Sequence, residues 1–323
     1  MIKYICNFRH TIRYSSAFST IELIISSLLA SVLLLGLIFV TYLPIKITRY
    51  TDDINAAQTR AEMVFAILRN PLEQCGYGMP KEVSAYRKSF GASGAPFNWQ
   101  GPISVSTAST ALWTREKGIC KIAYGVGTKI RTLASADVSG DRIEVRVTGV
   151  PSMLEGTASD NYSENVVKNW ILSGAMMPYF RPLIQYAPPR RLPEGGVMLS
   201  FRMNAPLADS ETFIPENDEL FYFRAMECAI MKRDGDYAFV TNDYTGSGWQ
   251  PRVTGVVDVR FELDADNRLL RVITLTRGIR RYDEIITKGL PEGWPTRYSY
   301  AIPADARHYR LMTNRASFAL KNF

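Results

Sequence analysis

Histidine and cysteine are scarce in this sequence, with two and four residues respectively among 323. Two histidines leave almost no material for a histidine-based metal site or a Ser-His-Asp triad. Glycine-rich phosphate loops, Gly-x-Ser-x-Gly and Cys-x-x-Cys are also absent from the sequence. The sequence therefore predicts a protein that is not an enzyme, with no catalytic residue, no cofactor and no metal ion.

Acidic residues are absent from the first 17 positions, which hold Lys3, Arg9 and Arg13. Of the 38 basic residues, these three leave 35 against 31 acidic residues in the rest of the chain. Such a balance indicates an ordinary surface and makes nucleic-acid binding unexpected. Hydrophobic residues make up 46% and charged residues 21%, a composition that can bury a core and excludes collagen-like and disordered chains.

A single long apolar run extends from Leu23 to Leu43, 21 residues without a charge. As an α-helix it would be ~31 Å long, which matches the hydrocarbon core of a bilayer. The basic segment before it places the N-terminus in the cytoplasm and everything after Pro44 outside the cytoplasm. The sequence therefore predicts a single-pass protein of the cytoplasmic membrane.

Three interpretations of this run compete. A secretory signal peptide has a shorter apolar core, of about 7–15 residues, followed by a small-residue cleavage site, and the sequence has neither. A plain signal anchor fits the length but does not explain Glu22, a carboxylate at the edge of the run, where acidic residues are costly. The third interpretation takes the residues around that carboxylate into account.

The stretch Ala17-Phe-Ser-Thr-Ile-Glu-Leu-Ile resembles the class III signal of type IV prepilins, in which a basic leader and a small residue precede a Phe-Thr-Leu-Ile-Glu-like sequence and an apolar helix. The resemblance implies that prepilin peptidase cleaves between Ala17 and Phe18 and methylates the new amino group of Phe18. It also implies an assembly role for Glu22, which would meet the N-terminus of a neighbouring subunit in a filament. The sequence departs from the family at Ala17, where glycine is usual.

Small residues recur within the apolar run, at Ser27 and Ser31 and at Ser26 and Ala30. Small side chains four positions apart let apolar helices approach one another closely. We therefore assign helix packing to Ser27 and Ser31, although serine is common in membrane spans and the same spacing arises by chance.

Beyond Pro44 the apolar pattern becomes amphipathic. Steps of three and four residues form one helical stripe, which consists of Ile54, Ala57, Ala61, Val64, Leu68 and Leu72. Asp52 and Asp53 are among the polar residues expected on the other faces. A helix that is continuous over 18–74 would be ~85 Å long, with Pro44 and Pro71 expected to kink or open it locally. Two separate helices joined at Pro44 are the alternative.

Strands are predicted from alternating apolar residues and turn signals, over 141–147, 219–232, 236–241, 255–263, 269–276 and 309–320. The segments 81–117 and 151–218 have little periodicity and are predicted to be irregular. Without βαβ alternation, the fold class is α+β with a mainly antiparallel sheet packed on the helix. The residues expected to be buried are Ile54, Val64, Leu68, Ile143, Val145, Phe221, Phe223, Val257, Val259, Phe261 and Ile273.

Several pieces of the chain, in order, resemble the PilW-like minor pilins of type IV pili: Cys75-Gly-Tyr-Gly, Gly140-Asp-Arg-Ile-Glu-Val-Arg-Val, Glu219-Leu-Phe-Tyr-Phe-Arg, Val253-Thr-Gly-Val-Val-Asp-Val-Arg-Phe and a C-terminal Leu320-Lys-Asn-Phe. This resemblance implies a pilin-like fold and incorporation into a pilus or its priming complex. The implied partners are prepilin peptidase, other minor pilins, the major pilin and the inner-membrane assembly platform. A tip adhesin is left open as a further partner.

The resulting organisation is a leader over 1–17, a membrane or filament-core helix over 18–44, and a periplasmic or extracellular globular domain over 45–323 that includes the amphipathic helix 45–75. A large pseudopilin of type II secretion is the alternative within the same superfamily. A membrane-anchored enzyme or binding protein is a remote alternative, because no catalytic constellation is found.

The remaining candidate residues are predicted to have structural roles. Cys6 leaves with the leader, and of the three other cysteines we expect Cys75 and Cys120 to pair, although the sequence does not fix the pairing. The run Asp264-Ala-Asp-Asn267 lacks the spacing of a calcium loop and is predicted to be a hairpin turn. Two further assignments are a solvated strand edge for the basic cluster Arg277, Arg280, Arg281 and Tyr282, and a surface or strand position for His308.

Overall fold

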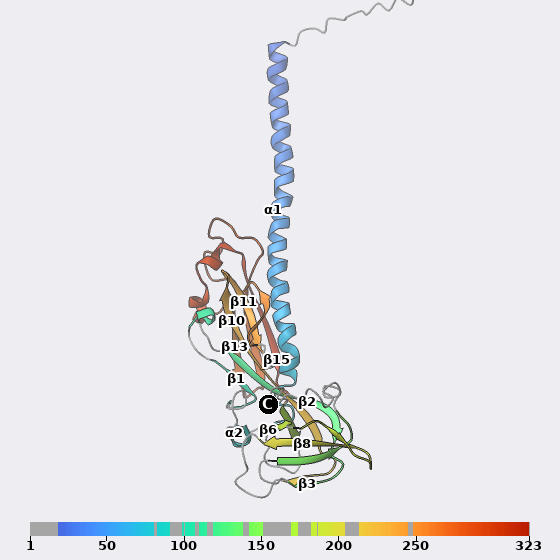
Figure 1. The fold of residues 1–323 in the computed structure, drawn as a ribbon. Coiled ribbons are helices and arrows are strands. Elements are labelled where there is room, and N and C mark those ends of the chain that lie inside the picture. The colour runs from blue at the N-terminus through green and yellow to red at the C-terminus, as the bar shows by residue number, and fades with distance from the viewer. Residues whose placement is uncertain are drawn as a thin grey trace, which may run out of the picture. The chain divides into compact units, whose positions relative to one another are not determined.

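A computed structural model describes residues 19–80, 83–90, 99, 101–106, 110–114, 119–137, 142–150, 169–173, 182–185, 187–203, 213–244 and 248–322. In these residues the protein is α+β: one long helix near the N-terminus is followed by antiparallel sheets (Figure 1). The predicted class is therefore confirmed. The chain divides into two units, Met1–Asp52 and Asp53–Phe323.

Helix α1 extends without interruption over Thr20–Glu73, 54 residues. It continues through Pro44 and Pro71, so the alternative of two separate helices joined at Pro44 is wrong. Each proline removes only its own amide donor, while the neighbouring residues keep their bonds. The predicted stripe is buried from Ala57 to Leu72, but Ile54 at its start is only partly buried.

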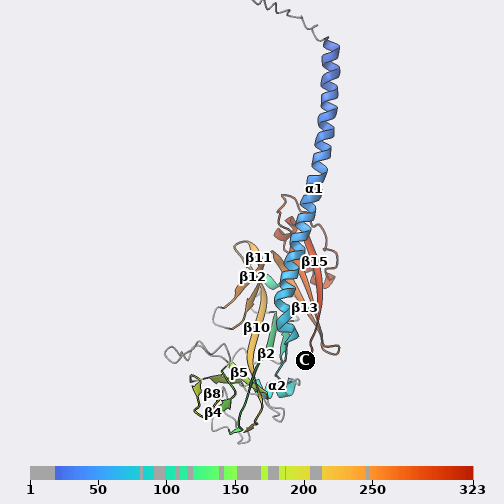
Figure 2. The same cartoon turned by 90° about the vertical axis from the view of Figure 1, so that its right-hand side faces the viewer.

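The larger sheet has ten strands in the described part of the chain, and each of its pairings is antiparallel (Figures 1 and 2). Its main path is β1 (Ile103–Val105), β2 (Cys120–Arg131), β10 (Glu219–Arg233), β5 (Asn169–Ser173), β6 (Pro182–Gln185), β8 (Val197–Met203) and β4 (Arg142–Val147). Strand β11 (Asp236–Asn242) joins β10 to β12 (Gln250–Thr254), and β7 (Arg190–Arg191) pairs with β8.

A second sheet has three strands, β13 (Val256–Asp264), β14 (Leu269–Arg277) and β15 (Leu311–Ala319), in that order. Two short strands, β3 (Ala136–Asp137) and β9 (Phe213–Ile214), pair with each other. The remaining elements are helix α2 (Val83–Phe90) and the 3-10 helices η1 (Leu112–Thr114), η2 (Thr296–Ala301) and η3 (Asp305–His308).

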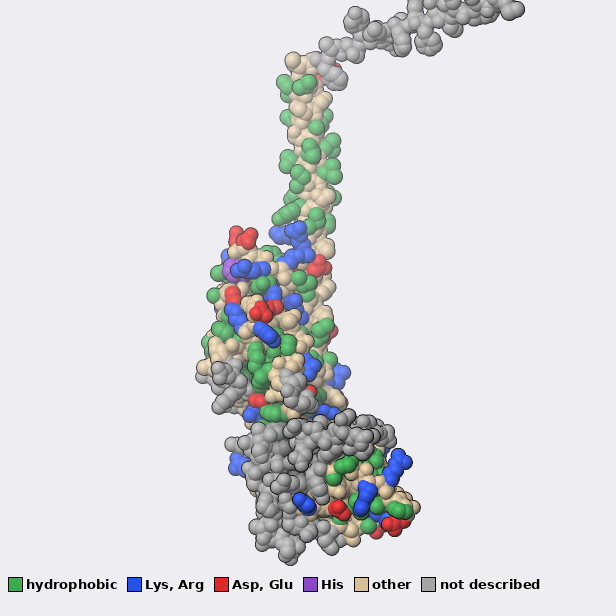
Figure 3. All heavy atoms as spheres, viewed as in Figure 1, with side chains coloured by type: hydrophobic (Ala, Val, Ile, Leu, Met, Phe, Trp, Pro, Cys, Tyr) green, Lys and Arg blue, Asp and Glu red, His purple; other side chains and the backbone are tan. Residues whose placement is uncertain are grey.

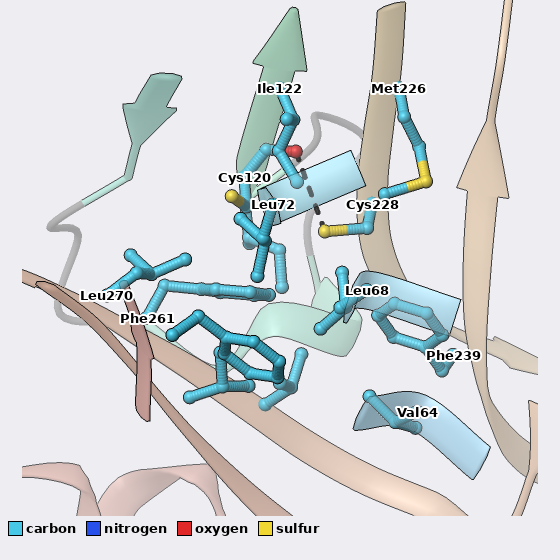
Figure 4. Packing of buried hydrophobic residues seen from close by; sticks show 14 of the residues in the cluster. Val64, Leu68, Leu72, Cys120, Ile122, Met226, Cys228, Phe239, Phe261 and Leu270 are labelled. Atoms are coloured by element: carbon cyan, nitrogen blue, oxygen red, sulfur yellow. Dashed lines mark hydrogen bonds between the residues drawn. The ribbon is translucent and has the colours of Figure 1, made fainter. Parts of the chain in front are cut away.

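The main core lies where the second half of α1 meets both sheets (Figure 4). Val64, Leu68 and Leu72 of the helix share one cluster with Phe239 of β11 and Phe261 of β13. The alternation along β13 and β14 explains this, because one face of the three-stranded sheet turns its apolar residues toward the helix. The helix stripe and the sheet face therefore bury each other.

A second core lies apart from the helix. It is formed by apolar residues of β2, β4, β8, β9 and β10: Ile130, Ile143, Val145, Val147, Val197, Leu199, Phe201, Ile214 and Leu220. The facing pair β4 and β8 supplies most of it, with Ile143 opposite Phe201 and Val145 opposite Leu199.

Four predicted features agree with the structure: β4, the β10–β11 hairpin, the β13–β14 hairpin and the closing strand β15. Of the residues predicted to be buried, Ile54 is the exception, and the side chain of Phe223 lies outside those described. The region 151–218 is not wholly irregular as predicted, since it contains β5 to β9. β5, β6, β7 and β9 have only two to five residues, so their side chains give too few repeats for a period to be recognised.

The largest correction is β2, a central strand of 12 residues that the sequence reading missed. Its sequence contains Gly125 and Gly127, which interrupt the apolar alternation and weaken a strand signal. Gly125 serves a close approach of backbone: a Cβ at this position would lie 2.5 Å from the carbonyl oxygen of Tyr77. The Gly125 amide donates a hydrogen bond to that same oxygen at 2.9 Å.

We predict that Leu68→Ala will lower the free energy of unfolding by about 2–5 kcal/mol, because it opens a cavity in the main core. Leu68 is fully buried, whereas Met63 on the same helix is 51% exposed. Met63→Ala is therefore the matched control and should change stability by no more than about 0.5 kcal/mol. Urea unfolding of the full chain in detergent measures both, and equal effects of the two variants would contradict the assigned core face of α1.

Candidate functional site

The first turn of α1 is closed by a reciprocal pair of side-chain hydrogen bonds. The Ile21 amide donates to the Ser19 hydroxyl at 3.3 Å, and the Ser19 amide donates to Glu22 Oε2 at 3.0 Å. This is a capping box, which satisfies amide groups that have no partner within the helix. The carboxylate also lies in the first turn, where the helix dipole favours negative charge. Glu22 therefore stabilises the start of α1 in the single chain.

The N-terminal half of α1 presents apolar side chains on all sides. Large hydrophobic residues from Ile21 to Ile47 are 48–72% exposed, and the space-filling view shows them along the helix (Figure 3). By length and composition this helix could cross a membrane, and in the described residues it is the one helix that could. A helix that is apolar all round needs lipid or other helices to cover it.

The two serines assigned to helix packing are exposed on this half of α1. The Ser27 hydroxyl donates to the carbonyl oxygen of Ile24 at 2.8 Å, and the Ser31 hydroxyl donates to that of Ser27 at 2.7 Å. Because their donors are satisfied within the helix, both serines can face hydrocarbon or another helix without an unpaired hydroxyl. Their role in packing remains a prediction.

The part of α1 that belongs to the unit Asp53–Phe323 starts with a buried carboxylate, that of Asp53, which has no exposed surface. Its Oδ2 accepts a hydrogen bond from the Tyr282 hydroxyl at 2.6 Å, and its Oδ1 accepts one from the Arg280 amide at 3.1 Å. The Arg310 Nε lies 3.9 Å from Oδ2. These groups provide hydrogen bonds and a positive charge, which a buried carboxylate requires.

Two further contacts attach the helix to the end of β14. The Thr276 hydroxyl donates to the carbonyl oxygen of Ala57 at 2.8 Å, and the Arg60 guanidinium donates to the carbonyl oxygens of Arg277 and Gly278. Gly278 lies against Asp53, so that a Cβ at Gly278 would be 2.8 Å from the Asp53 Cβ. We call Asp53, Arg60, Thr276, Tyr282 and Arg310 the spine anchor.

The spine anchor corrects two predictions. Asp53 was expected on a polar face of the helix, but it lies one turn before Ala57 on the buried stripe. The basic cluster of Arg277, Arg280, Arg281 and Tyr282 is only partly the predicted solvated edge, because Arg281 is exposed but Arg277 and Tyr282 have carboxylate partners. Arg277 forms an ion pair with Asp236 at 2.9 Å, and Tyr282 bonds Asp53. Arg277 and Tyr282 serve the fold, because carboxylates within the same unit accept their hydrogen bonds.

The other candidate residues are placed as follows. Asp264 and Asn267 form the predicted hairpin turn, in which Asp264 accepts hydrogen bonds from the amide and the side chain of Asn267. His308 lies in η3, with its Nδ1 3.0 Å from the carbonyl oxygen of Tyr282. Among the residues that the structure describes, no group of three His, Cys, Asp or Glu side chains is arranged to hold a metal ion.

Cys75, Cys120 and Cys228 are all buried free thiols in this structure, which has no bond between any two of them, the predicted pair Cys75–Cys120 included. The Cys75 Sγ instead donates to the carbonyl oxygen of Pro102 at 3.6 Å. The Cys228 Sγ donates to the carbonyl oxygen of Cys120 at 3.5 Å. The strand that carries Cys120 was missed from the sequence, and with it the pairing of that strand with β10, which places Cys228 opposite Cys120.

Two residues of the predicted processing site, Ala17 and Phe18, lie outside the described residues. Comparison with protein-family models, curated proteins and solved structures found no match to this chain. The prepilin resemblance therefore depends on the residues of the sequence.

We predict that Asp53→Asn will destabilise the protein by about 2 kcal/mol, because hydrogen bonds to a charged acceptor are replaced by neutral ones and Arg310 loses its counter-charge. The exposed neighbour Asp52 supplies the control Asp52→Asn, with a much smaller effect. Urea unfolding measures the change, and hydrogen exchange over 278–286 should rise in Asp53→Asn alone. Unchanged exchange there would contradict an anchoring role for Asp53.

Proposed function

We propose that this protein is a minor pilin of the type IV prepilin superfamily, processed at the cytoplasmic membrane and incorporated into a pilus or its priming complex. The observation that carries the proposal is the segment Ala17–Ile24. It follows a basic leader, and within it the small residue Ala17 is followed after five residues by the carboxylate of Glu22, just before the uncharged run. The capped, fully apolar half of α1 supports it, because such a surface suits first a bilayer and then a bundle of helices.

Glu22 would act twice in this scheme. In the single chain it accepts the Ser19 amide and caps the helix. Cleavage before Phe18 would create a positively charged amino group one helical turn before Glu22. During assembly, the carboxylate of Glu22 would meet the amino group of Phe18 in a neighbouring subunit. A carboxylate among apolar helices requires such a partner, because an isolated charge in hydrocarbon is strongly unfavourable.

A location and a set of partners follow from the same proposal. The N-terminus would lie in the cytoplasm and the unit after Asp52 in the periplasm, and later on the outside of the cell within the filament. Prepilin peptidase, the other minor pilins, the major pilin and the inner-membrane assembly platform would be its partners. Strands β3 to β9, which lie between β2 and β10 in the chain, are compatible with a pilin-like core that has been enlarged by an insertion.

We predict cleavage between Ala17 and Phe18, leaving residues 18–323 with an N-methylated Phe18. Intact mass and N-terminal sequencing of the membrane-derived protein test this. Ala17→Gly should still be cleaved, whereas Ala17→Leu should remain full length, because the resemblance places a small residue at the end of the leader. A mature N-terminus at any other residue, or a chain that is not cleaved at all, would refute the proposal.

Three variants separate the two roles of Glu22. Glu22→Gln keeps an oxygen that can cap the helix but removes the charge, Glu22→Ala removes both, and Ser19→Ala removes the hydroxyl of the capping box but keeps the carboxylate. We expect normal cleavage in all three. Recovery together with other prepilin-motif proteins should fall at least about tenfold in both Glu22 variants, the equivalent of ~1.4 kcal/mol.

Ser19→Ala should be incorporated almost as well as the unaltered chain, since it retains the charge. Wild-type recovery of Glu22→Gln would show that capping is sufficient and that the carboxylate has no charged partner in assembly. Recovery with a secretion machinery instead of a pilus would favour a type II secretion pseudopilin.

A further inference from the structure

The three described cysteines meet in the main core, although they are far apart in the sequence. Cys75 follows the end of α1, Cys120 begins β2 and Cys228 lies in β10. Each has no exposed surface, and all three belong to the same buried cluster. Figure 4 shows Cys120 and Cys228 within this cluster.

Cys120 and Cys228 occupy directly opposite positions in the antiparallel pairing of β2 and β10. Opposite residues in such a pair have Cα atoms about 4.5–5.5 Å apart, and a disulfide requires a Cα separation of about 4.4–6.8 Å. The two side chains already interact: the Cys228 Sγ donates to the carbonyl oxygen of Cys120 at 3.5 Å. Burial, hydrogen bonding to Cys228 and the nearby thiols also raise the pKa of Cys120.

Cys75 is placed differently. It forms an isolated bridge opposite Tyr124, four residues along β2 from Cys120, and its Sγ is hydrogen-bonded to the carbonyl oxygen of Pro102 at 3.6 Å. Burial raises the pKa of the Cys75 thiol to about 12. The pKa of the Cys120 thiol is raised by burial in the same way, so position and not reactivity decides the pairing: the residue opposite Cys75 is Tyr124, whereas the residue opposite Cys120 is Cys228.

The position of the Cys120–Cys228 pair in the chain is also distinctive. The pair is separated by 108 residues. This loop contains the whole second core, from Ile130 to Leu220, together with strands β3 to β9. The two cysteines therefore stand at the base of this inserted part, where the chain leaves the main core and returns to it.

We propose that Cys120 and Cys228 form a disulfide when the chain folds outside the cytoplasm, while Cys75 stays a free thiol. The compartment in this inference rests on the proposed function, because disulfides persist in the oxidising periplasm and not in the cytoplasm. The bond would close the loop that holds the second core and restrict that loop in the unfolded chain.

The oxidant is the disulfide of an exported thiol oxidase. One cysteine thiolate attacks this disulfide and forms a mixed disulfide with the oxidase, releasing one of its sulfurs as a thiolate. The second cysteine thiolate then attacks the mixed disulfide, so that the Cys120–Cys228 bond forms as the oxidase leaves. The two cysteine thiols lose two protons and two electrons in total, and the oxidase disulfide becomes a dithiol.

The test uses the full chain, isolated from membranes in detergent without reductant, denatured with an alkylating agent and digested for mass spectrometry. We expect the peptide that carries Cys120 linked to the one that carries Cys228, with Cys75 alkylated. Prior reduction should abolish the linked peptide. Cys75→Ser should keep the link, and Cys120→Ser and Cys228→Ser should each lose it.

Alkylation of both Cys120 and Cys228 without reduction, or a link that includes Cys75, would overturn the inference. This result needs no variant, so misfolding of a substituted chain does not affect it. The N-terminus of the same sample separates the two proposals. Free thiols in a chain that begins at Phe18 refute the disulfide alone, whereas free thiols in an uncleaved chain count against the proposed function as well.

Discussion

Mutual burial of one stripe of α1 and one face of the sheet β13–β14–β15 is the interaction on which the globular part depends. The residues on the stripe change size along the helix, from Ala57 and Ala61 to Val64, Leu68 and Leu72. Alanine at the first positions lets the helix backbone approach the sheet, which is why the Thr276 hydroxyl reaches the carbonyl oxygen of Ala57. Larger side chains further along fill the core between the helix and both sheets.

The spine anchor is a polar addition to this apolar contact, and it lies where the stripe ends. A buried carboxylate is unfavourable unless hydrogen bonds and positive charge compensate it. Asp53 obtains these from Arg280, Tyr282 and Arg310, all of which belong to the segment between β14 and β15. The anchor thus fixes the connecting segment to the helix, where an apolar residue would leave its position less specified.

Helices and strands could be predicted from the sequence where the spacing of apolar side chains repeats several times. The stripe from Ala57 to Leu72 and the hairpins of β10–β11 and β13–β14 could be predicted, because side-chain alternation and turn residues agree there. It failed at β2, where Gly125, which the close approach of the Tyr77 carbonyl requires, and Gly127 interrupt the apolar pattern. Asp53 was also missed, since a single polar residue on a stripe signals burial only when its distant partners are known. The capping box of Ser19 and Glu22 was visible in the sequence, but the prepilin resemblance drew attention to the carboxylate alone.

The pairing of α1 with the last strands has a consequence for the order of folding. Ala57 and Thr276 are separated by 219 residues, and Phe65 of the helix packs against Phe318 near the end of the chain. A protein whose first helix is covered by its last strand has high contact order and must close a very long loop before its core forms. During synthesis the stripe of α1 therefore remains incompletely covered until β15 has been made. A nascent chain that stops short of β15 lacks the strand that packs against Phe65, and its exposed helix is a site for aggregation or for capture by a chaperone.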